Sequence, residues 1–346
     1  MKAVFLIIDF VPHQVLSIKT LIEKNDGEIL AFHVTESSHD DLRDSRNFTS
    51  LHYKAFTKKE ILKKIELYAP NIIVTAGWMI PEYNWVCKQM KENTNIPVVA
   101  MSDTPWYGTF KQKINTILSP FHVKKAFTHL WVAGLYQYDY ARKLGFANDK
   151  IIYNCLSANT DLFAAIDIKK KIEKFPKNFL YIGRYTEVKG LRNLMIAWSA
   201  IEDKKGWTFT LIGNGEMREE LIKDGNFIVK DYLHQDELVK ELAETGCFVL
   251  PSLHEPWALV IHEAAAAGIP IICTKTCGAA PHFVIDHYNG FKVANDSVSS
   301  LTEAMKKIIE TDVSELVEYS YNSRKLSNAI SPEKSAASLM QLANNQ

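Results

Sequence analysis

The sequence predicts an α/β protein in which two doubly wound parallel sheets form two domains in tandem. Three observations support this fold class. The chain has 346 residues, enough for two domains of about 150 residues each. Hydrophobic residues make up 47% and charged residues 23%, a globular mixture that can build sizeable cores. Short apolar runs alternate with segments of helical periodicity, which is the pattern of parallel strands covered by helices on both faces.

The first half of the chain begins with a βαβ unit. Residues 3–8 form a continuous apolar run, residues 15–22 have helical spacing, and Asn25-Asp26-Gly27 turns the chain toward the next strand. The alternation continues with expected strands at 28–34, 71–75 and 96–101 and expected helices at 58–68 and 82–91. We therefore expect a first Rossmann-like domain over residues 1–165.

The second half repeats the pattern after a lysine-rich stretch at 165–178, which we interpret as a linker. We expect strands at 179–183, 207–212, 247–250 and 270–273, and helices at 191–201, 235–244 and 259–267. A second Rossmann-like domain over residues 166–329 follows. Tandem sheets of this kind place a ligand in a central cleft at the carboxyl ends of their strands.

Composition excludes several classes of protein. Forty basic residues balance forty acidic ones, so no overall charge attracts the chain to nucleic acid or anionic lipid. The five cysteines are odd in number and scattered, which favours a reducing compartment over a disulfide framework. The N-terminal apolar run ends at Asp9 and is too short for a signal peptide or a bilayer span. We expect a cytoplasmic protein that binds no nucleic acid.

Two basic residues follow the first expected strand of the second domain. Arg184 comes directly after that strand, and Lys189 lies five residues later, where Gly190 opens a helix. A helix N-terminus with two fixed cations beside it favours phosphate, and a diphosphate suits the spacing. The alternative is a pair of solvated charges flanking a loop.

A glycine pair follows the next expected strand. Gly213 and Gly215 let the backbone approach a ligand closely before a helix begins at Met217. An ordinary tight turn between a strand and a helix is the alternative.

Two glutamates form the most specific motif, Glu255-Pro-Trp-Ala-Leu-Val-Ile-His-Glu263. If Pro256 starts a helix, Glu255 lies outside it and Glu263 two turns inside it. Carboxylates so placed can accept hydrogen bonds from separate hydroxyls of one polyol. The alternative makes Glu255 a helix cap and Glu263 a partner in a surface salt bridge, although the apolar neighbours of Glu263 favour a buried position.

The ordered set of motifs resembles the donor half of retaining glycosyltransferases of family GT4, which have the GT-B fold. The resemblance is carried by Arg184-x4-Lys189, Gly213-x-Gly215 and Glu255-x7-Glu263, and by Lys150-Ile-Ile-Tyr-Asn154 with Asn159-Thr-Asp161-Leu-Phe163. It covers about two-thirds of the chain and is strong over residues 128–294. It implies that the C-terminal helix, over about 330–346, packs back on the first domain.

The resemblance also implies roles for individual residues. Arg184 and Lys189 would bind the donor diphosphate and offset the charge of the leaving group. Glu255 would contact the donor sugar and Glu263 the nucleotide ribose. Further donor contacts are implied for Gly183, Gly213, Gly215, Tyr232, Leu233, Ala258, Leu259 and Val260. No cofactor is implied, because the UDP- or GDP-linked sugar is the substrate, and no metal is needed where the two cations supply the charge.

The first domain departs from the family pattern in two places. Many members have paired glycines after the first strand, where this chain has Asp9-Phe10-Val11-Pro12-His13. Many also have a histidine near the reacting carbon, where this chain has Ser102-Asp103-Thr104. Asp103 is then the candidate catalytic group at the sugar. Its alternative role is a turn or helix cap before Pro105.

A local basic and apolar stretch lies at residues 104–138. These residues include no aspartate or glutamate. Its candidate acceptor-side or membrane-side residues are Trp106, Tyr107, Lys111, Lys113, Lys124 and Lys125. The combination favours an anionic membrane face or a lipid diphosphate. A helix that buries its apolar side and solvates its lysines is an equal alternative.

The sequence therefore predicts a retaining glycosyltransferase that moves a sugar from a nucleotide donor to a glycan or lipid-linked acceptor at the inner face of the plasma membrane. The alternatives are a GT-B epimerase or phosphorylase and a catalytically silent sugar-nucleotide-binding partner. A zinc site at Cys273, Cys277 and His282 is disfavoured, since the spacing is not a standard knuckle and no second pair follows.

Overall fold

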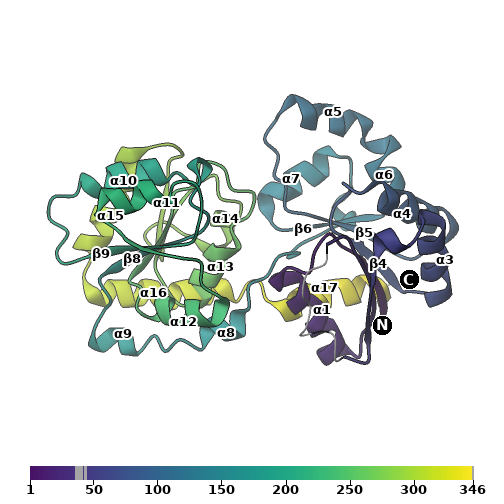
Figure 1. The fold of residues 1–346 in the computed structure, drawn as a ribbon, viewed down its shortest axis with the longest axis horizontal. Helices are drawn as coiled ribbons and strands as arrows, with labels where there is room; N and C mark the ends of the chain where they lie inside the picture. The colour runs from purple at the N-terminus through teal and green to yellow at the C-terminus, as the bar shows by residue number, and fades with distance from the viewer. Residues whose placement is uncertain (36–41, 43–44, 345–346) are drawn as a thin grey trace. The chain divides into compact units, whose positions relative to one another are not determined.

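The structure of the chain is a computed structural model that describes residues 1–35, 42 and 45–344. The chain forms two compact units. Unit 1 comprises Met1–Ser157 and the C-terminal segment from Ile330, and unit 2 comprises Ala158–Ala329. The chain therefore passes from one unit to the other twice, at residues 157–158 and 329–330 (Figure 1).

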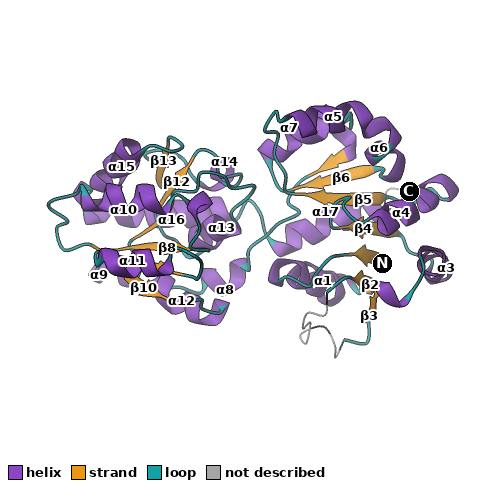
Figure 2. Ribbon diagram, turned by 45° about the horizontal axis from the view of Figure 1, so that its top comes forward, coloured by secondary structure: helices purple, strands orange, loops and turns teal. Residues whose placement is uncertain are grey.

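Unit 1 is built on a parallel sheet whose strand order is β3-β2-β1-β4-β5-β6-β7. The strands are β1 (Lys2–Leu6), β2 (Glu28–His33), β3 (Phe48–His52), β4 (Ile72–Thr75), β5 (Val98–Ser102), β6 (His129–Val132) and β7 (Ile151–Ile152). Every residue of β4 and β6 is buried, because helices cover both faces of the sheet (Figure 2).

The helices of unit 1 come from the first part of the chain and from its C-terminal segment. They are α1 (Pro12–Asn25), α3 (Lys58–Tyr68), α4 (Pro81–Asn93), α5 (Phe110–Leu118), α6 (Val123–Ala126), α7 (Leu135–Lys143) and α17 (Pro332–Asn344), with 3-10 turns η1 (Tyr53–Ala55), η2 (Ser119–Phe121) and η3 (Asn148–Lys150). The last helix, α17, lies beside α1 (Figure 1), where Lys24 pairs with Glu333 at 2.6 Å. Ser335 also donates to the carbonyl of Asn154 at 2.6 Å.

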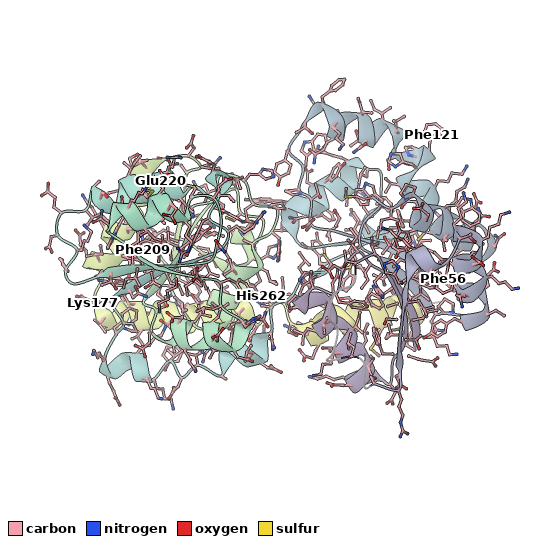
Figure 3. The ribbon with its side chains drawn as sticks, in the orientation of Figure 1. Phe56, Phe121, Lys177, Phe209, Glu220 and His262 are labelled. Atoms are coloured by element: carbon pink, nitrogen blue, oxygen red, sulfur yellow. The ribbon has the colours of Figure 1, made fainter. Side chains whose placement is uncertain are left out.

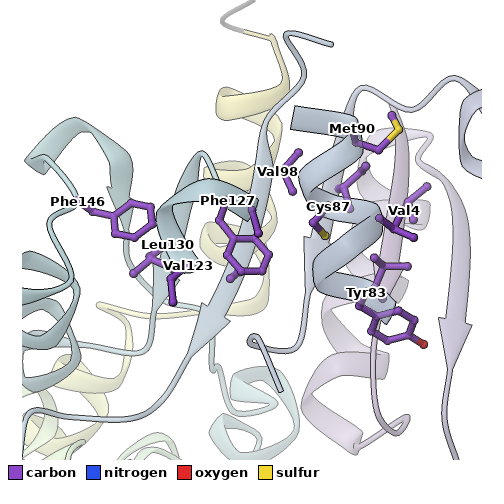
Figure 4. Packing of buried hydrophobic residues seen from close by; sticks show 14 of the residues in the cluster. Val4, Tyr83, Cys87, Met90, Val98, Val123, Phe127, Leu130 and Phe146 are labelled. Atoms are coloured by element: carbon purple, nitrogen blue, oxygen red, sulfur yellow. The ribbon is translucent and has the colours of Figure 1, made fainter. Parts of the chain in front are cut away.

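The core of unit 1 lies between its sheet and the helices that flank it. Tyr83, Cys87 and Met90 project from one face of α4 into the same cluster as Val4 of β1 and Val98 of β5 (Figure 4). All five are nearly or fully buried. The apolar positions of α4 recur at intervals of three and four residues, so one helical face packs on the sheet.

Unit 2 repeats the architecture with a parallel sheet of order β10-β9-β8-β11-β12-β13. Its strands are β8 (Asn178–Ile182), β9 (Thr208–Ile212), β10 (Ile228–Lys230), β11 (Cys247–Leu250), β12 (Ile271–Thr274) and β13 (Gly290–Val293). Its helices are α8 (Thr160–Ala164), α9 (Lys170–Glu173), α10 (Leu191–Ser199), α11 (Arg218–Asp224), α12 (Gln235–Ala243), α13 (Leu259–Ala266), α14 (Ala280–Phe283), α15 (Val298–Glu310) and α16 (Val313–Ser327), and the turn η4 (Glu187–Lys189) precedes α10.

The linker prediction at 165–178 is wrong. This segment belongs to unit 2, where Ile166, Ile168, Lys171 and Phe175 are buried. The first passage between the units lies at residues 157–158, eight residues before the expected end of the first domain. Lysine-rich composition suggested a solvated connection, but the apolar residues between the lysines pack against unit 2.

Candidate functional site

The predicted functional residues of the second half lie on loops at the carboxyl ends of three neighbouring strands. Arg184 and Lys189 follow β8, Gly213 follows β9, and Glu255 follows β11. In the sheet of unit 2 the strand order reverses direction between β8 and β11. Doubly wound sheets bind their ligands at this switch point, outside the carboxyl ends of the strands.

Lys189 and Glu255 form an ion pair across the switch point. Nζ of Lys189 donates to Oε2 of Glu255, and the hydroxyl of Ser252 donates to the same oxygen at 3.3 Å. The two charged side chains are only 14% and 12% exposed, so water screens them less than it screens a surface pair. A cation and a carboxylate therefore stand side by side, where they could bind a phosphate and a hydroxyl of one ligand.

Gly190 brings the loops that carry this pair together. Its φ is 69°, and a Cβ at this position would lie 2.2 Å from the carbonyl oxygen of Pro251. The amide of Leu253 also donates to the carbonyl of Val188 at 2.9 Å. Only a residue without a side chain allows the two backbones to approach this closely.

Glycines also allow the loop after β8 and the loop after β9 to approach each other closely. A Cβ on Gly213 would lie 1.9 Å from the carbonyl oxygen of Gly183, and one on Gly215 would lie 2.4 Å from that of Tyr185. The amide of Tyr185 donates to the carbonyl of Asn214 at 2.8 Å. The glycines thus pack loop against loop within unit 2, and a contact with the donor remains a prediction.

Arg184 is exposed on the loop after β8. Its carbonyl accepts from the hydroxyl of Tyr181 at 2.8 Å, which fixes the backbone of the loop. No ion pair between described residues includes its guanidinium. The structure therefore places Arg184 on the same loop as Lys189, and its phosphate-binding role remains a prediction.

Glu263 is buried in α13. Its side chain accepts a hydrogen bond of 3.4 Å from Nε2 of Gln235, the first residue of α12. Burial raises the pKa of this carboxyl to about 7. A surface salt bridge, the alternative considered above, is wrong because the residue is only 8% exposed. Sequence reasoning missed Gln235, which lies 28 residues from its partner.

The N-terminus of α13 agrees with the helix expected at 259–267 and excludes a helix start at Pro256. The helix begins at Leu259 and not at Pro256, so Glu263 lies one turn inside it rather than two. Its N-cap is Ala258, in the left-handed region at φ 78°, and no side chain caps it. The alternative role of Glu255 as a helix cap is therefore wrong. The first amides of a helix have no partner within it, so those of Leu259 and Val260 suit an anion.

Tyr232 and Leu233 follow β10, at the edge of the sheet of unit 2. Tyr232 is exposed and packs edge-on against His234, with 5.4 Å between the ring centroids. Leu233 is half-buried. Their predicted contact with the base remains a prediction.

Comparison with known proteins identifies the family of unit 2. Residues 163–326 match the family described as "Glycosyl transferases group 1". Unit 2 belongs to this family. The resemblance stated from the motifs is thereby confirmed.

The chain is similar over part of its length to two curated relatives. It is 30% identical over 176 residues to the glycogen synthase of Mycobacterium tuberculosis, a match that covers 48% of this chain and 41% of that protein. It is 31% identical over 133 residues to the lipopolysaccharide core biosynthesis glycosyltransferase LpsE of Rhizobium meliloti, covering 37% of this chain and 38% of LpsE. The matches thus span about two fifths of these relatives.

A solved structure extends the likeness to the whole fold. The crystal structure of Anabaena Alr3699/HepE in complex with UDP superposes with a TM-score of 0.79 over 100% of both chains, at 13% sequence identity. The predicted α/β fold of the GT-B type is confirmed.

The loop after β1, where group 1 members commonly have paired glycines, contributes side chains to a cavity in unit 1. His13 and Gln14 lie at the start of α1 and line this cavity of about 500 Å³ with Trp78, Asp103 and Lys111. The cavity lies beyond the carboxyl ends of β1, β4 and β5, and β1 and β4 flank the switch point of this sheet. Burial lowers the pKa of His13 to about 4, so its imidazole is neutral near pH 7.

Asp103 is exposed at the start of the loop after β5, and its carbonyl accepts from Nε2 of Gln137 at 3.0 Å. The following helix, α5, is capped by Thr109, whose hydroxyl accepts from the amide of Gln112 at 3.3 Å. Asp103 is therefore not the cap of this helix. Its position on the cavity wall is consistent with the predicted role at the sugar.

The basic and apolar stretch forms an exposed surface of unit 1, which we call the α5–α6 surface. Its lysines, Lys111, Lys113, Lys124 and Lys125, are exposed. Its exposed apolar side chains are Phe110, Ile114, Ile117, Leu118 and Phe121. Phe121 projects outward from unit 1 in Figure 3. The alternative of a helix that buries its apolar side is wrong for α5, since Phe110 is 79% and Ile117 73% exposed.

Trp106 is half-buried, whereas Tyr107 is 40% exposed. Trp106 packs against Tyr140, with ring centroids 5.8 Å apart, and Nζ of Lys143 lies 5.1 Å from its ring centre. The amide of Tyr107 donates to the side chain of Gln112 at 2.8 Å. These two residues therefore support the fold of the stretch.

Two further features bear on the predictions. Within the part of the chain that the structure describes, no helix has the length and apolar character needed to traverse a lipid bilayer. Among the same residues, no group of three or more histidine, cysteine or acidic side chains has the spacing of a metal site. All five cysteines are buried free thiols.

Proposed function

We propose that the protein is a retaining glycosyltransferase that moves a sugar from a UDP- or GDP-linked donor to a glycan or lipid-linked acceptor, in the synthesis of a bacterial-type surface polysaccharide or glycolipid. The observation that carries this proposal is the partly buried ion pair of Lys189 with Glu255 at the switch point of unit 2. UDP in the structure of HepE and the name of LpsE support a nucleotide donor and a glycolipid product.

The donor would bind along the loops of unit 2. Its diphosphate would take hydrogen bonds from Lys189, Arg184 and the first amides of α13, where the helix dipole also favours negative charge. A sugar hydroxyl would donate to Glu255 in place of Lys189, and a ribose hydroxyl would donate to Glu263. When the donor binds, the ion pair would therefore open. Lys189 would bind the diphosphate, and Glu255 would bind a sugar hydroxyl.

The reaction would need no enzyme nucleophile. The bond from the anomeric carbon to the phosphate oxygen breaks, and the acceptor oxygen bonds to the same face of that carbon. The proton of the acceptor hydroxyl passes to the departing phosphate oxygen. Lys189 and Arg184 stabilise the charge that grows on the diphosphate, which is the role that a divalent cation plays in other enzymes.

The cavity of unit 1 would receive the acceptor. Its volume of about 500 Å³ suits one or two sugar rings, and it combines an indole surface at Trp78 with polar groups at Gln14 and Asp103. Asp103 would accept a hydrogen bond from a hydroxyl at the reacting end. Lys111 would favour an acceptor that carries negative charge.

The proposal is tested by release of nucleoside diphosphate from a panel of UDP- and GDP-sugars, with and without acceptors. Lys189→Ala should weaken nucleoside diphosphate binding about 10- to 150-fold, since a charge-assisted hydrogen bond contributes about 1.5–3 kcal/mol. Glu255→Gln should leave that affinity within about threefold and lower kcat by about 100-fold or more. Lys223→Ala, which removes an exposed lysine of α11, is the matched control.

The outcomes separate the alternatives. Release that requires an acceptor supports transfer, whereas conversion of the sugar nucleotide without acceptor would indicate an epimerase. Tight nucleotide binding with no turnover across a broad acceptor panel would indicate a silent binding partner. An unchanged affinity in Lys189→Ala would remove the diphosphate assignment.

We also propose that the α5–α6 surface contacts an anionic membrane face, at the cytoplasmic side of the plasma membrane. Exposed aromatic and aliphatic side chains flanked by lysines are typical of an interfacial segment. Each lysine near an anionic surface contributes roughly 1 kcal/mol. Because the chain as a whole has no net charge, this attraction would come from the local surface.

Vesicle sedimentation tests the membrane proposal. Alanine at Lys111, Lys113, Lys124 and Lys125 together should weaken binding to vesicles containing phosphatidylglycerol by at least tenfold, and added salt should weaken wild-type binding likewise. The control replaces four lysines near or on α3, Lys54, Lys58, Lys59 and Lys63, which removes the same charge elsewhere on unit 1. Equal binding by the two variants would contradict the proposal.

A further inference from the structure

His262 is a fully buried histidine in the middle of α13, one residue before Glu263 (labelled in Figure 3). Its Nδ1 accepts a hydrogen bond of 3.1 Å from the amide of Ala158. Its Nε2 lies 3.1 Å from the carbonyl oxygen of Ser327. A backbone amide can only donate and a carbonyl can only accept, so the proton lies on Nε2 and the imidazole is neutral.

The ring of His262 is also held in its plane. It stacks on Phe283 with 4.3 Å between ring centroids and 10° between ring planes. Phe283 is fully buried, and its carbonyl accepts from Nδ2 of Asn289 at 2.8 Å. This stacking fixes the orientation of the ring, so each of its two nitrogens points toward its hydrogen-bond partner.

The two residues bonded to His262 lie at the two passages between the units. Ala158 is the first residue of unit 2, and Ser327 ends α16 two residues before Ala329, where unit 2 ends. Any motion of one unit relative to the other must be absorbed by backbone rotations in these short connections, which are the covalent links between the units. A single imidazole is therefore hydrogen-bonded to both connections.

We infer that His262 is a positioning residue that ties both connections between the units to the helix of the donor site. The inference rests on the proposed function, because α13 also carries Glu263 and the amides proposed to bind the diphosphate. If α13 shifts when the donor binds, the imidazole of His262 would move with it, and its two hydrogen bonds would move residues 158 and 327 as well. Conversely, the hydrogen bonds to the two connections would fix the position of α13 during catalysis.

Two substitutions test this role. His262→Phe keeps the stack on Phe283 and removes both hydrogen bonds. His262→Gln offers an amide oxygen to Ala158 and an amide NH₂ to Ser327, so it should restore part of the function. The control is Ser320→Ala, which removes a buried hydroxyl of α16 that donates to the carbonyl of Leu316 at 3.0 Å within the same helix.

Hydrogen exchange should separate positioning from stability alone. In His262→Phe, amides near 158 and near 327–330 should exchange at least tenfold faster, while the strands of unit 2 keep their protection. Donor KM and nucleoside diphosphate affinity should stay within about threefold, and kcat should fall at least tenfold, with partial recovery in His262→Gln. Faster exchange at only one connection, or the same kinetic losses in Ser320→Ala, would overturn the inference.

Wild-type protein gives a second measurement that needs no variant. Adding UDP or GDP should slow exchange at both connections, and unchanged exchange in a protein that binds the nucleotide would contradict the inference. If calorimetry shows that neither nucleotide binds, the proposed function fails. The comparison of His262→Phe with wild type in the absence of nucleotide then still decides whether the ring holds both connections.

Discussion

Burial gives Glu263 a pKa of about 7, well above the ordinary value of a glutamate, so its charge changes near neutral pH. Between pH 4.5 and pH 7 the folded protein keeps a proton on this carboxyl that the unfolded chain has released. The free energy of unfolding therefore falls as the pH rises through this window. Above it, the folded protein carries a buried carboxylate whose contact with Gln235 offsets only part of the cost.

Glu263→Gln should relieve this cost, because a neutral amide replaces the carboxylate. Chemical denaturation at pH 5 should give the variant and wild type similar stability. At pH 8 the variant should be more stable, by up to about 3 kcal/mol. An equal difference at the two pH values would show that the carboxyl does not titrate in this window.

The same carboxylate links donor binding to pH. In the proposed donor site a ribose hydroxyl would donate to the ionised form of Glu263, so nucleoside diphosphate affinity of the wild type should increase from pH 6 to pH 8. The variant should lack this part of the pH dependence.

At the level of residues, the sequence predicted groups that follow neighbouring strands and missed groups that meet from distant segments. Lys189 and Glu255 each follow a strand of one parallel sheet, so their proximity could be expected from order and spacing. Gln235 and Ser252 belong to no recognisable motif. The contact of Gln235 with Glu263 depends on how α12 packs, and that of Ser252 with Glu255 depends on the loop after β11. Such contacts require the folded structure.

At the level of elements, long capped helices and continuous apolar strands were predictable, and a very short edge strand was not. The expected helix at 58–68 coincides with α3, where Thr57 and Glu60 form a capping box. Central strands such as β4 are continuous apolar runs because both of their faces are buried. The edge strand β7 has only two residues, Ile151 and Ile152, which is too short for a periodic signal.

The segment at 165–178 shows why composition alone misled. Lys171 has the side chain of a solvated residue but is buried, and its Nζ donates to the carbonyls of Thr245 and Gly268, both at 3.1 Å. Desolvation lowers its pKa to about 7. A lysine of this kind cannot be distinguished from its exposed neighbours in the sequence.

The helix α13 is anchored by cations at its C-terminal end. Arg324 donates to the carbonyl of Ala266 at 3.1 Å and to that of Ala267 at 3.3 Å, and Lys171 reaches Gly268 just beyond. Positive charge at this end complements the helix dipole and satisfies carbonyls that lack partners within the helix. The opposite end is the one that we propose to bind the diphosphate.

At the level of the molecule, the two units share one strand order, to which unit 1 adds a seventh strand, but they have different features at the switch point. Unit 2 has an ion pair and a helix N-terminus there, and unit 1 has a cavity lined by polar side chains, among them Asp103 and Lys111, and by an indole. The first combination suits a charged donor, and the second suits a sugar acceptor. Net charge was uninformative because the lysines of the α5–α6 surface are balanced by acidic residues elsewhere.

The most direct test of the donor site is a crystal structure of the protein with UDP-glucose and, in parallel, with a GDP-sugar. We predict the diphosphate within hydrogen-bond distance of Nζ of Lys189 and the amides of Leu259 and Val260. The carboxylate of Glu255 should accept a hydrogen bond from a sugar hydroxyl and no longer contact Lys189. A nucleotide bound elsewhere, with the pair of Lys189 and Glu255 intact, would contradict the account.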